Sequence, residues 1–201
     1  MRRAAALWAM MVLAAAALPM RPAGAAGGPG VVPVPKGVNR LSLGGQAILT
    51  VRARRENYNA HSFDVLSFYT VKPGQPGDEL NLVPIFGAEH GKDIERHDIT
   101  VSGGADCLLR DFRLLQASGR QPARLVVAER DVGASYVTPG TVHFTYYELT
   151  RNTDEVPGRP SLYFQAGGES RSRQAYCDVN DAFDRELHLG KSSDGAVSPT
   201  E

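Results

Sequence analysis

The sequence predicts a mainly β protein: an antiparallel β domain, sandwich-like or built on a curved sheet, with a short helix near its C-terminus. Two observations support this fold class. Short apolar or alternating runs recur along the chain, separated by stretches rich in Gly, Pro, Asn and Asp. One segment close to the end instead carries apolar residues at helical spacing.

The N-terminal segment has the pattern of a secretory signal peptide over residues 1–25. A basic start at Arg2-Arg3 precedes an apolar run over residues 4–18, and Ala23-Gly24-Ala25 offers a small-residue cleavage pattern. The apolar run is shorter than the roughly 20 residues that a membrane-spanning helix needs. We therefore expect export to the periplasm or secretion, rather than a membrane anchor.

The rest of the chain is expected to form one domain. Residues 26–37 are rich in Gly and Pro and predict a flexible leader, residues 38–190 a single β-rich domain, and residues 191–201 a disordered tail. Removing the signal peptide lowers the count of Lys and Arg from 22 to 19, against 22 Asp and Glu. The net charge of about −3 argues against nucleic acid as a partner. No later stretch is long and apolar enough to span a membrane.

The expected strands share β-branched, aromatic or alternating apolar residues between turn signals. In chain order they are residues 47–51, 62–71, 80–86, 107–115, 125–128, 141–149 and 161–165. Pro84 indicates an edge or a bulge in the third strand. The polar run over residues 52–57 is expected to end the first strand.

The segment around Cys107 fits either a helix or a strand. Leu108, Phe112 and Leu115 would line one side of a helix, whereas a strand would place Leu108 and Phe112 on one face and Asp111 on the other. A glycine pair before the segment and a polar, proline-containing loop after it favour the strand. Residues 125–128 would then return as its hairpin partner.

One helix is expected near the C-terminus. Val179, Phe183 and Leu187 repeat at i, i+4 and i+8 and would form one apolar face. Asp178 is suited to cap its start, and Gly190 to end it.

Cys107 and Cys177 are the two cysteines of the chain. In an exported protein they meet an oxidising compartment, which predicts a disulfide. The bridge would close a loop of about 70 residues and stabilise the fold by roughly 4 kcal/mol in the chain-entropy model. The alternatives are a reactive thiol, although no motif places a histidine beside either cysteine, and a zinc ligand, although zinc sites bring more cysteines or paired histidines.

The candidate ligand-binding residues are polar groups at strand ends, where loops on a rigid β scaffold often bind. They are Asn57, Asn59, His61, Glu129, Arg130 and Asp131. The asparagines could equally form a turn, because Asn tolerates left-handed backbone and bonds its own turn. The three charges after residue 128 could equally be surface charge.

Known catalytic motifs are missing from the sequence. It contains no G-x-S-x-G elbow, no H-E-x-x-H, no Gly-rich phosphate loop and no S-x-x-K. This favours a non-enzymatic protein that binds a small molecule or an envelope protein, with no cofactor and no metal. The alternative is an envelope hydrolase with an unrecognised acid–base site drawn from His61, Asp64, Glu129 and Asp131.

Several segments, taken in order behind a signal peptide, resemble the periplasmic carbapenem intrinsic-resistance (CarG-like) proteins. They are Asn59–Val65 with Phe68-Tyr69, Leu82–Phe86, Asp106–Leu115, Ala128–Gly133 with Ser135-Tyr136, and Tyr176–Asn180. The resemblance implies a small, mainly β periplasmic protein. It also implies a role in antibiotic resistance, namely protection against a carbapenem without hydrolysing it.

We predict that the mature chain starts near Ala26, because the small residues at positions 23–25 follow an apolar run of signal-peptide length. N-terminal sequencing of the protein purified from its native host checks this. Soluble cytoplasmic protein that retains Met1 would contradict it.

Overall fold

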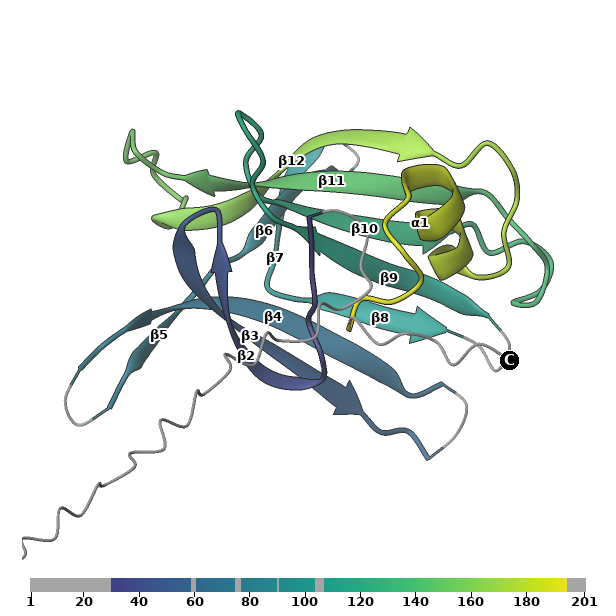
Figure 1. The fold of residues 1–201 in the computed structure, drawn as a ribbon, viewed down its shortest axis with the longest axis horizontal. Coiled ribbons are helices and arrows are strands. Elements are labelled where there is room, and N and C mark those ends of the chain that lie inside the picture. The colour runs from purple at the N-terminus through teal and green to yellow at the C-terminus, as the bar shows by residue number, and fades with distance from the viewer. Residues whose placement is uncertain (1–29, 59–60, 75–76, 90, 104–106, 195–201) are drawn as a thin grey trace, which may run out of the picture.

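The structure is a computed structural model that describes residues 30–58, 61–74, 77–89, 91–103 and 107–194. Within these ranges the chain forms twelve strands and one helix (Figure 1). The expected signal peptide and Asn59 lie outside the described residues. No helix in the described ranges is long and apolar enough to cross a membrane.

Along the chain, all the strands precede the helix. They are β1 (Val31–Val32), β2 (Gly37–Leu43), β3 (Gln46–Arg55), β4 (Phe63–Lys72), β5 (Glu79–Leu82), β6 (Ile85–Glu89), β7 (Lys92–Arg96), β8 (Ile99–Gly103), β9 (Leu108–Leu115), β10 (Arg124–Arg130), β11 (Val142–Arg151), β12 (Leu162–Arg171) and α1 (Val179–Leu187).

The strands form one open, mixed sheet in the order β2-β3-β4-β8-β9-β10-β11-β12-β6-β7. Off this path, β1 pairs with β9 and β5 pairs with β4. The sheet curves so that β2, β3 and β4 lie across from the strands β9 to β12 (Figure 1). The mainly β fold with a short C-terminal helix is confirmed. The sheet departs from a purely antiparallel one where β12 and β6 pair in parallel.

The chain crosses between the two halves of the sheet at Val83 and Pro84. The Val83 amide donates to the Phe68 carbonyl in β4, and the Pro84 carbonyl accepts from the Phe164 amide in β12, both at 2.8 Å. Proline has no N–H to donate, so it suits a position where only its carbonyl is used. The strand expected over residues 80–86 is therefore two strands, β5 and β6, that pair with different neighbours.

The main core fills the space between the two halves of the sheet. The Phe68 and Phe164 rings meet there, with centroids 5.0 Å apart. Its buried residues are Val34, Leu43, Ile48, Leu66, Phe68, Val83, Ile85, Ile99, Val101, Phe112, Leu114, Ala123, Leu125, Val127, Tyr147, Leu162 and Phe164. In β9 and β10 these are alternate residues, because successive side chains of a strand point to opposite faces.

A second core lies on the outer face of β9 to β11, under α1. Val126 and Phe144 from the sheet pack there with Val179 and Phe183 from the helix. The Phe144 and Phe183 rings are 5.5 Å apart between centroids. The helix expected from the apolar spacing is confirmed, and Asp178 caps it by accepting a hydrogen bond of 2.7 Å from the Asn180 amide.

A buried ion pair fixes the helix to β9. The Arg113 guanidinium donates to Asp111 at 3.0 Å, to the Asn180 side chain at 2.7 Å and to the Gly190 carbonyl at 2.9 Å. It also lies over the Phe183 ring, 4.2 Å from its centroid. Burial raises the pKa of Asp111, and the Arg113 charge opposes that rise. Loss of either partner would leave an uncompensated buried charge.

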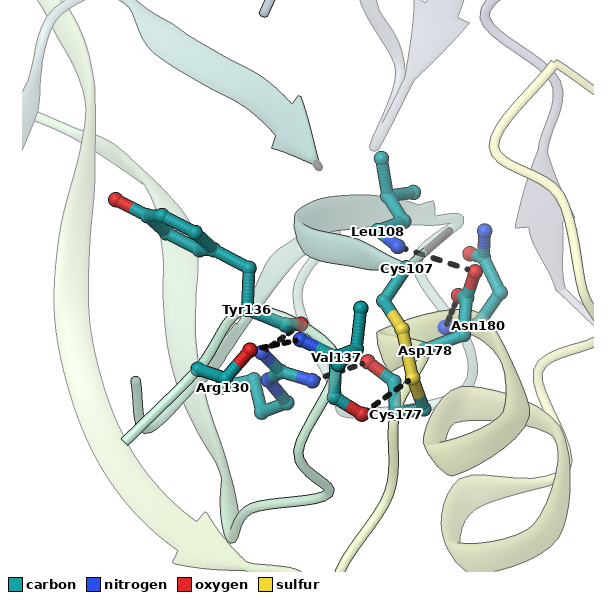
Figure 2. The surroundings of a disulfide bond; sticks show 9 residues. Cys107, Leu108, Arg130, Tyr136, Val137, Cys177, Asp178 and Asn180 are labelled. Carbon is teal, nitrogen blue, oxygen red and sulfur yellow. Dashed lines mark hydrogen bonds between the residues drawn. A yellow bond between two sulfur atoms is a disulfide. The ribbon is translucent and has the colours of Figure 1, made fainter. Parts of the chain in front are cut away.

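The disulfide between Cys107 and Cys177 is confirmed (Figure 2). It joins the residue before β9 to the residue before the Asp178 cap, with Cα atoms 5.5 Å apart. Beside it, the Leu108 amide donates to the Asp178 side chain at 3.3 Å. The start of α1 is therefore held to the start of β9 by a covalent bond and a hydrogen bond.

The described parts of both terminal segments belong to the fold, unlike the expected leader over residues 26–37 and tail over residues 191–201. β1 pairs with the end of β9, and Val34 is fully buried. The Val34 amide donates to the Ser193 carbonyl at 2.9 Å, and Arg52 donates to the Val34 carbonyl and the Ser193 hydroxyl at 3.0 Å. The domain thus extends beyond residues 38–190, because the two segments satisfy each other's backbone groups and those of the sheet.

We predict that replacing Cys107 and Cys177 together by serine lowers the free energy of unfolding by roughly 2–5 kcal/mol, because the bridge restricts the unfolded chain. Urea denaturation of the oxidised proteins measures the change. In a reducing buffer the wild type and the double variant should have similar stability. Equal stability of the two under oxidising conditions would contradict the prediction.

Candidate functional site

An inner cavity of about 370 Å³ opens on the concave face of the sheet, between the β6–β7 hairpin and the strands β9 to β12. Its lining combines a few small and apolar residues with a ring of charged ones. The lining residues are Gly87, Ala88, Glu89, Arg96, Arg110, Val127, Glu129, Thr145, Tyr147, Ala166 and Glu169.

Strand alternation and register bring the lining residues together. In β10, Val127 and Glu129 point to the same face because they are two residues apart. Across the ladder, Val127 pairs with Thr145 of β11, and Glu129 pairs with Arg110 of β9. The inner face therefore changes along these strands from the apolar core to a polar cavity.

Tyr147 belongs to both the core and the cavity. Its side chain is only 6% exposed, and its neighbour Gly87 is so close that an added Cβ would lie 3.5 Å from the ring. Burial raises the pKa of Tyr147, while the charges of Arg96 and Arg110 oppose the rise. The phenol thus keeps its proton at neutral pH and can donate a hydrogen bond within the cavity.

The two guanidinium groups of the cavity differ in how they are used. Arg96 donates to the Glu89 carboxylate at 2.9 Å, which makes a conventional ion pair. The Arg110 Nε lies 3.8 Å from the Glu129 carboxylate, beyond hydrogen-bonding distance. That Nε is buried and has no hydrogen-bond partner among the described residues.

The predicted residues Glu129, Arg130 and Asp131 separate because they alternate along the end of β10. Glu129 lines the inner cavity. Arg130 points to the opposite face, is 2% exposed, and donates to the Tyr136 carbonyl at 2.6 Å and to the Cys177 carbonyl at 2.9 Å (Figure 2). It ties the β10–β11 loop to the disulfide instead of facing the cavity.

Asp131 meets a histidine that the sequence did not single out. Its carboxylate lies 3.0 Å from the His143 Nε2. The geometry of this contact does not make a hydrogen bond, and the Nε2 has no other partner among the described residues. His143 pairs with Glu129 across β10 and β11, two residues along the ladder from the cavity-lining pair of Val127 and Thr145. An imidazole and a carboxylate therefore meet beside the inner cavity, but neither lines it.

Asn57 and His61, the other predicted residues that the structure describes, lie in the β3–β4 turn. The Asn57 amide donates to the Ser62 hydroxyl at 3.0 Å, and its side chain donates to the His61 carbonyl at 2.7 Å. Asn57 thus acts as a turn former, one of the two roles open to it from the sequence. Neither Asn57 nor His61 lines the inner cavity, so the structure does not bring the predicted residues into a single site.

A second cavity of about 300 Å³ lies where β3 and β4 meet the C-terminal segment. Arg52, which was expected in the polar run that ends the first strand, is instead a buried residue of β3 and donates to Asp64 at 3.1 Å. Lys36 and Arg54 also lie within 4 Å of the Asp64 carboxylate, at 3.6 and 3.9 Å. This charge cluster joins Val34 to Ser193 through Arg52. Its cations already surround the buried Asp64 carboxylate.

Sequence reasoning missed Arg96, Arg110 and Tyr147. Arg110 left one signal: in a strand it shares a face with Leu108 and Phe112, so a charge interrupts an otherwise apolar face. Arg96 left none, because the sequence predicted no strand over residues 92–96. Within the described ranges no group of three or more His, Cys, Asp or Glu residues could hold a metal ion.

Comparison with known proteins identifies a similar fold. The solved structure of CarG matches with a TM-score of 0.57 and 23% sequence identity, covering 77% of this chain and 94% of CarG. No protein-family model matches the chain, and no curated protein matches its sequence. At this identity the likeness shows a CarG-like fold and assigns no activity or site.

We predict that Arg130→Met lowers the free energy of unfolding by about 1–3 kcal/mol, because it removes the donors to two carbonyls around the disulfide. Urea denaturation measures the change. Arg124→Met is the matched control. Arg124 belongs to the same strand as Arg130, and its substitution removes only an exposed hydrogen bond to Gln121, so it should change stability much less. Equal effects of the two substitutions would contradict a structural role for Arg130.

Proposed function

We propose that this protein is an exported, non-enzymatic binding protein whose inner cavity holds a small polar molecule, and that it protects against a carbapenem without hydrolysing it. The inner cavity carries the binding part of the proposal. Its volume of about 370 Å³ falls within the roughly 300–1,000 Å³ of small-molecule sites. Its lining places a protonated phenol and two guanidinium groups around one space.

The carbapenem part of the proposal rests on two supports. The sequence segments resemble the periplasmic carbapenem intrinsic-resistance proteins, and the fold is similar to that of CarG. Export is supported by the signal-peptide pattern and by the disulfide, a bond typical of oxidising compartments. Each support is independent of the cavity, so the ligand and the compartment can be tested separately.

The lining of the inner cavity supports binding in preference to catalysis. Among the described residues, its hydroxyl groups are those of Thr145 and Tyr147, and no histidine or cysteine of those residues lines it. Hydrolysis of a β-lactam needs an activated nucleophile or a metal-bound hydroxide. Glu169 pairs with Thr145 across β11 and β12, but no hydrogen bond among the described residues links that carboxylate to the hydroxyl, and a hydroxyl whose proton no base accepts is a weak nucleophile.

An envelope hydrolase is the second candidate, favoured by one observation. The contact between His143 and Asp131 is the kind of pair that can orient a general base. It lies next to the cavity in the strand register, on the same face of β11 as Thr145. If this candidate were correct, His143→Gln would abolish turnover and leave binding in place.

We predict saturable carbapenem binding without turnover, weakened about tenfold or more by Gly87→Val, because the larger side chain enters the cavity beside Tyr147. Equilibrium dialysis measures binding, and carbapenem absorbance over time, with and without added zinc, measures hydrolysis. Gly133→Val is the matched control, since a Cβ there meets no described atom within 4 Å.

Three results would decide against the proposal. Absence of saturable binding by the wild type would refute the carbapenem role. Equal binding by Gly87→Val and wild type would remove the inner cavity as its location. Turnover that disappears in His143→Gln would establish the hydrolase instead.

A further inference from the structure

Arg110 is the less satisfied of the two guanidinium groups that line the inner cavity. Its side chain is 27% exposed, and its Nε is buried with no hydrogen-bond partner among the described residues. The neighbouring Glu129 carboxylate remains 3.8 Å away and is 64% exposed. Native structures rarely leave such a donor unpaired, so the unpaired Nε calls for a physical explanation.

Three other arginines, Arg113, Arg130 and Arg96, differ from Arg110 in the hydrogen bonds that their guanidinium groups make. Arg113 and Arg130 are almost fully buried, and their terminal nitrogens donate to backbone carbonyls or side-chain acceptors. The Arg130 Nε has no hydrogen-bond partner among the described residues, but that side chain lines no cavity of the inner face. Arg96, on the far side of the same cavity, donates to Glu89 at 2.9 Å. Arg110 differs from Arg113 and Arg130 because it lines the inner cavity and is partly exposed. It differs from Arg96 because no hydrogen bond to a described residue occupies its guanidinium, so an acceptor from outside the chain could pair with its exposed nitrogens.

The surroundings of Arg110 define the acceptor. A guanidinium matches the planar, two-oxygen geometry of a carboxylate, and the Tyr147 hydroxyl offers a further neutral donor in the same cavity. Val127 and Ala166 supply apolar surface for an organic group. Glu129 and Glu169 add negative charge to the lining, which disfavours a multiply charged anion such as phosphate.

We infer that the inner cavity binds an organic monocarboxylate, with Arg110 as the residue that pairs with the carboxylate and Tyr147 as an accompanying donor. This inference rests on the proposed binding function and names the ligand class of the same site. It does not depend on the ligand being a carbapenem. A charged hydrogen bond of this kind changes affinity by on the order of 10- to 100-fold.

Nuclear magnetic resonance titrations with three matched fragments test the inference: N-acetylphenylalanine, its primary amide, and inorganic phosphate. The aromatic signals of Tyr147, assigned with Tyr147→Phe, report on occupancy of the cavity. In the wild type, N-acetylphenylalanine should shift these signals to saturation, the amide should bind at least about tenfold more weakly, and phosphate should have no effect.

In Arg110→Gln the preference for the acid over the amide should disappear, while Arg120→Gln, in an exposed turn outside the cavity, should keep it. Circular dichroism confirms that both variants are folded. Equal binding of acid and amide by the wild type, a preference that survives in Arg110→Gln, or no shift of Tyr147 with any fragment would each overturn the inference.

These outcomes are separable from those for the proposed function. A protein that binds the acid through Arg110 and fails to bind a carbapenem would refute the carbapenem role and retain the carboxylate site. A protein that binds a carbapenem as well in Arg110→Gln as in the wild type would retain the function and refute Arg110 as its anchor.

Discussion

The burial of β9 and β10 on both faces is the constraint on which the rest of the structure depends. One face of each strand must fit the main core, and the other must fit the underside of α1, so every residue in the middle of these strands has a packing partner. A shift of register by one residue would exchange the two sets and place Phe112 under the helix and Arg113 in the apolar core. The buried pair of Arg113 and Asp111 makes that exchange costly, because Arg113 donates to Asn180 of the helix and Asp111 depends on Arg113 as its charged partner.

The same alternation separates structural charges from charges that remain available. On the outer face, Arg113 and Arg130 donate to carbonyl oxygens at the ends of α1 and in the β10–β11 loop, and these contacts occupy their terminal nitrogens, although the Arg130 Nε has no partner among the described residues. On the inner face, Arg110 lies where the apolar core gives way to the cavity, and no carbonyl or side-chain oxygen of the described residues reaches its Nε. Neighbouring residues of one strand thus differ in role because they point in opposite directions.

The arrangement suits a protein that recognises rather than transforms its ligand. The cavity is built on strands, whose paired backbones hold Tyr147 and Arg110 in place before a ligand arrives, and such preorganisation favours affinity. The disulfide and the joined chain ends lie away from the lining of this cavity and stabilise the fold without contributing to the site. Similarity to CarG extends to the fold, while the chemistry of the site depends on this chain's own residues.

The sequence by itself determined the mainly β class, the β9–β10 hairpin, the capped helix from Asp178 and the Cys107–Cys177 pair, because each depends on local spacing or on there being two cysteines to pair. It could not show that residues 80–86 divide at Pro84 between two neighbours, nor that Arg52 is buried, because both depend on segments far apart in the chain. The candidate site was anticipated only at Glu129. The open sheet brings three strands around one cavity, and they contribute Arg96, Arg110 and Tyr147. These residues meet because of strand order and register, which the local sequence does not determine.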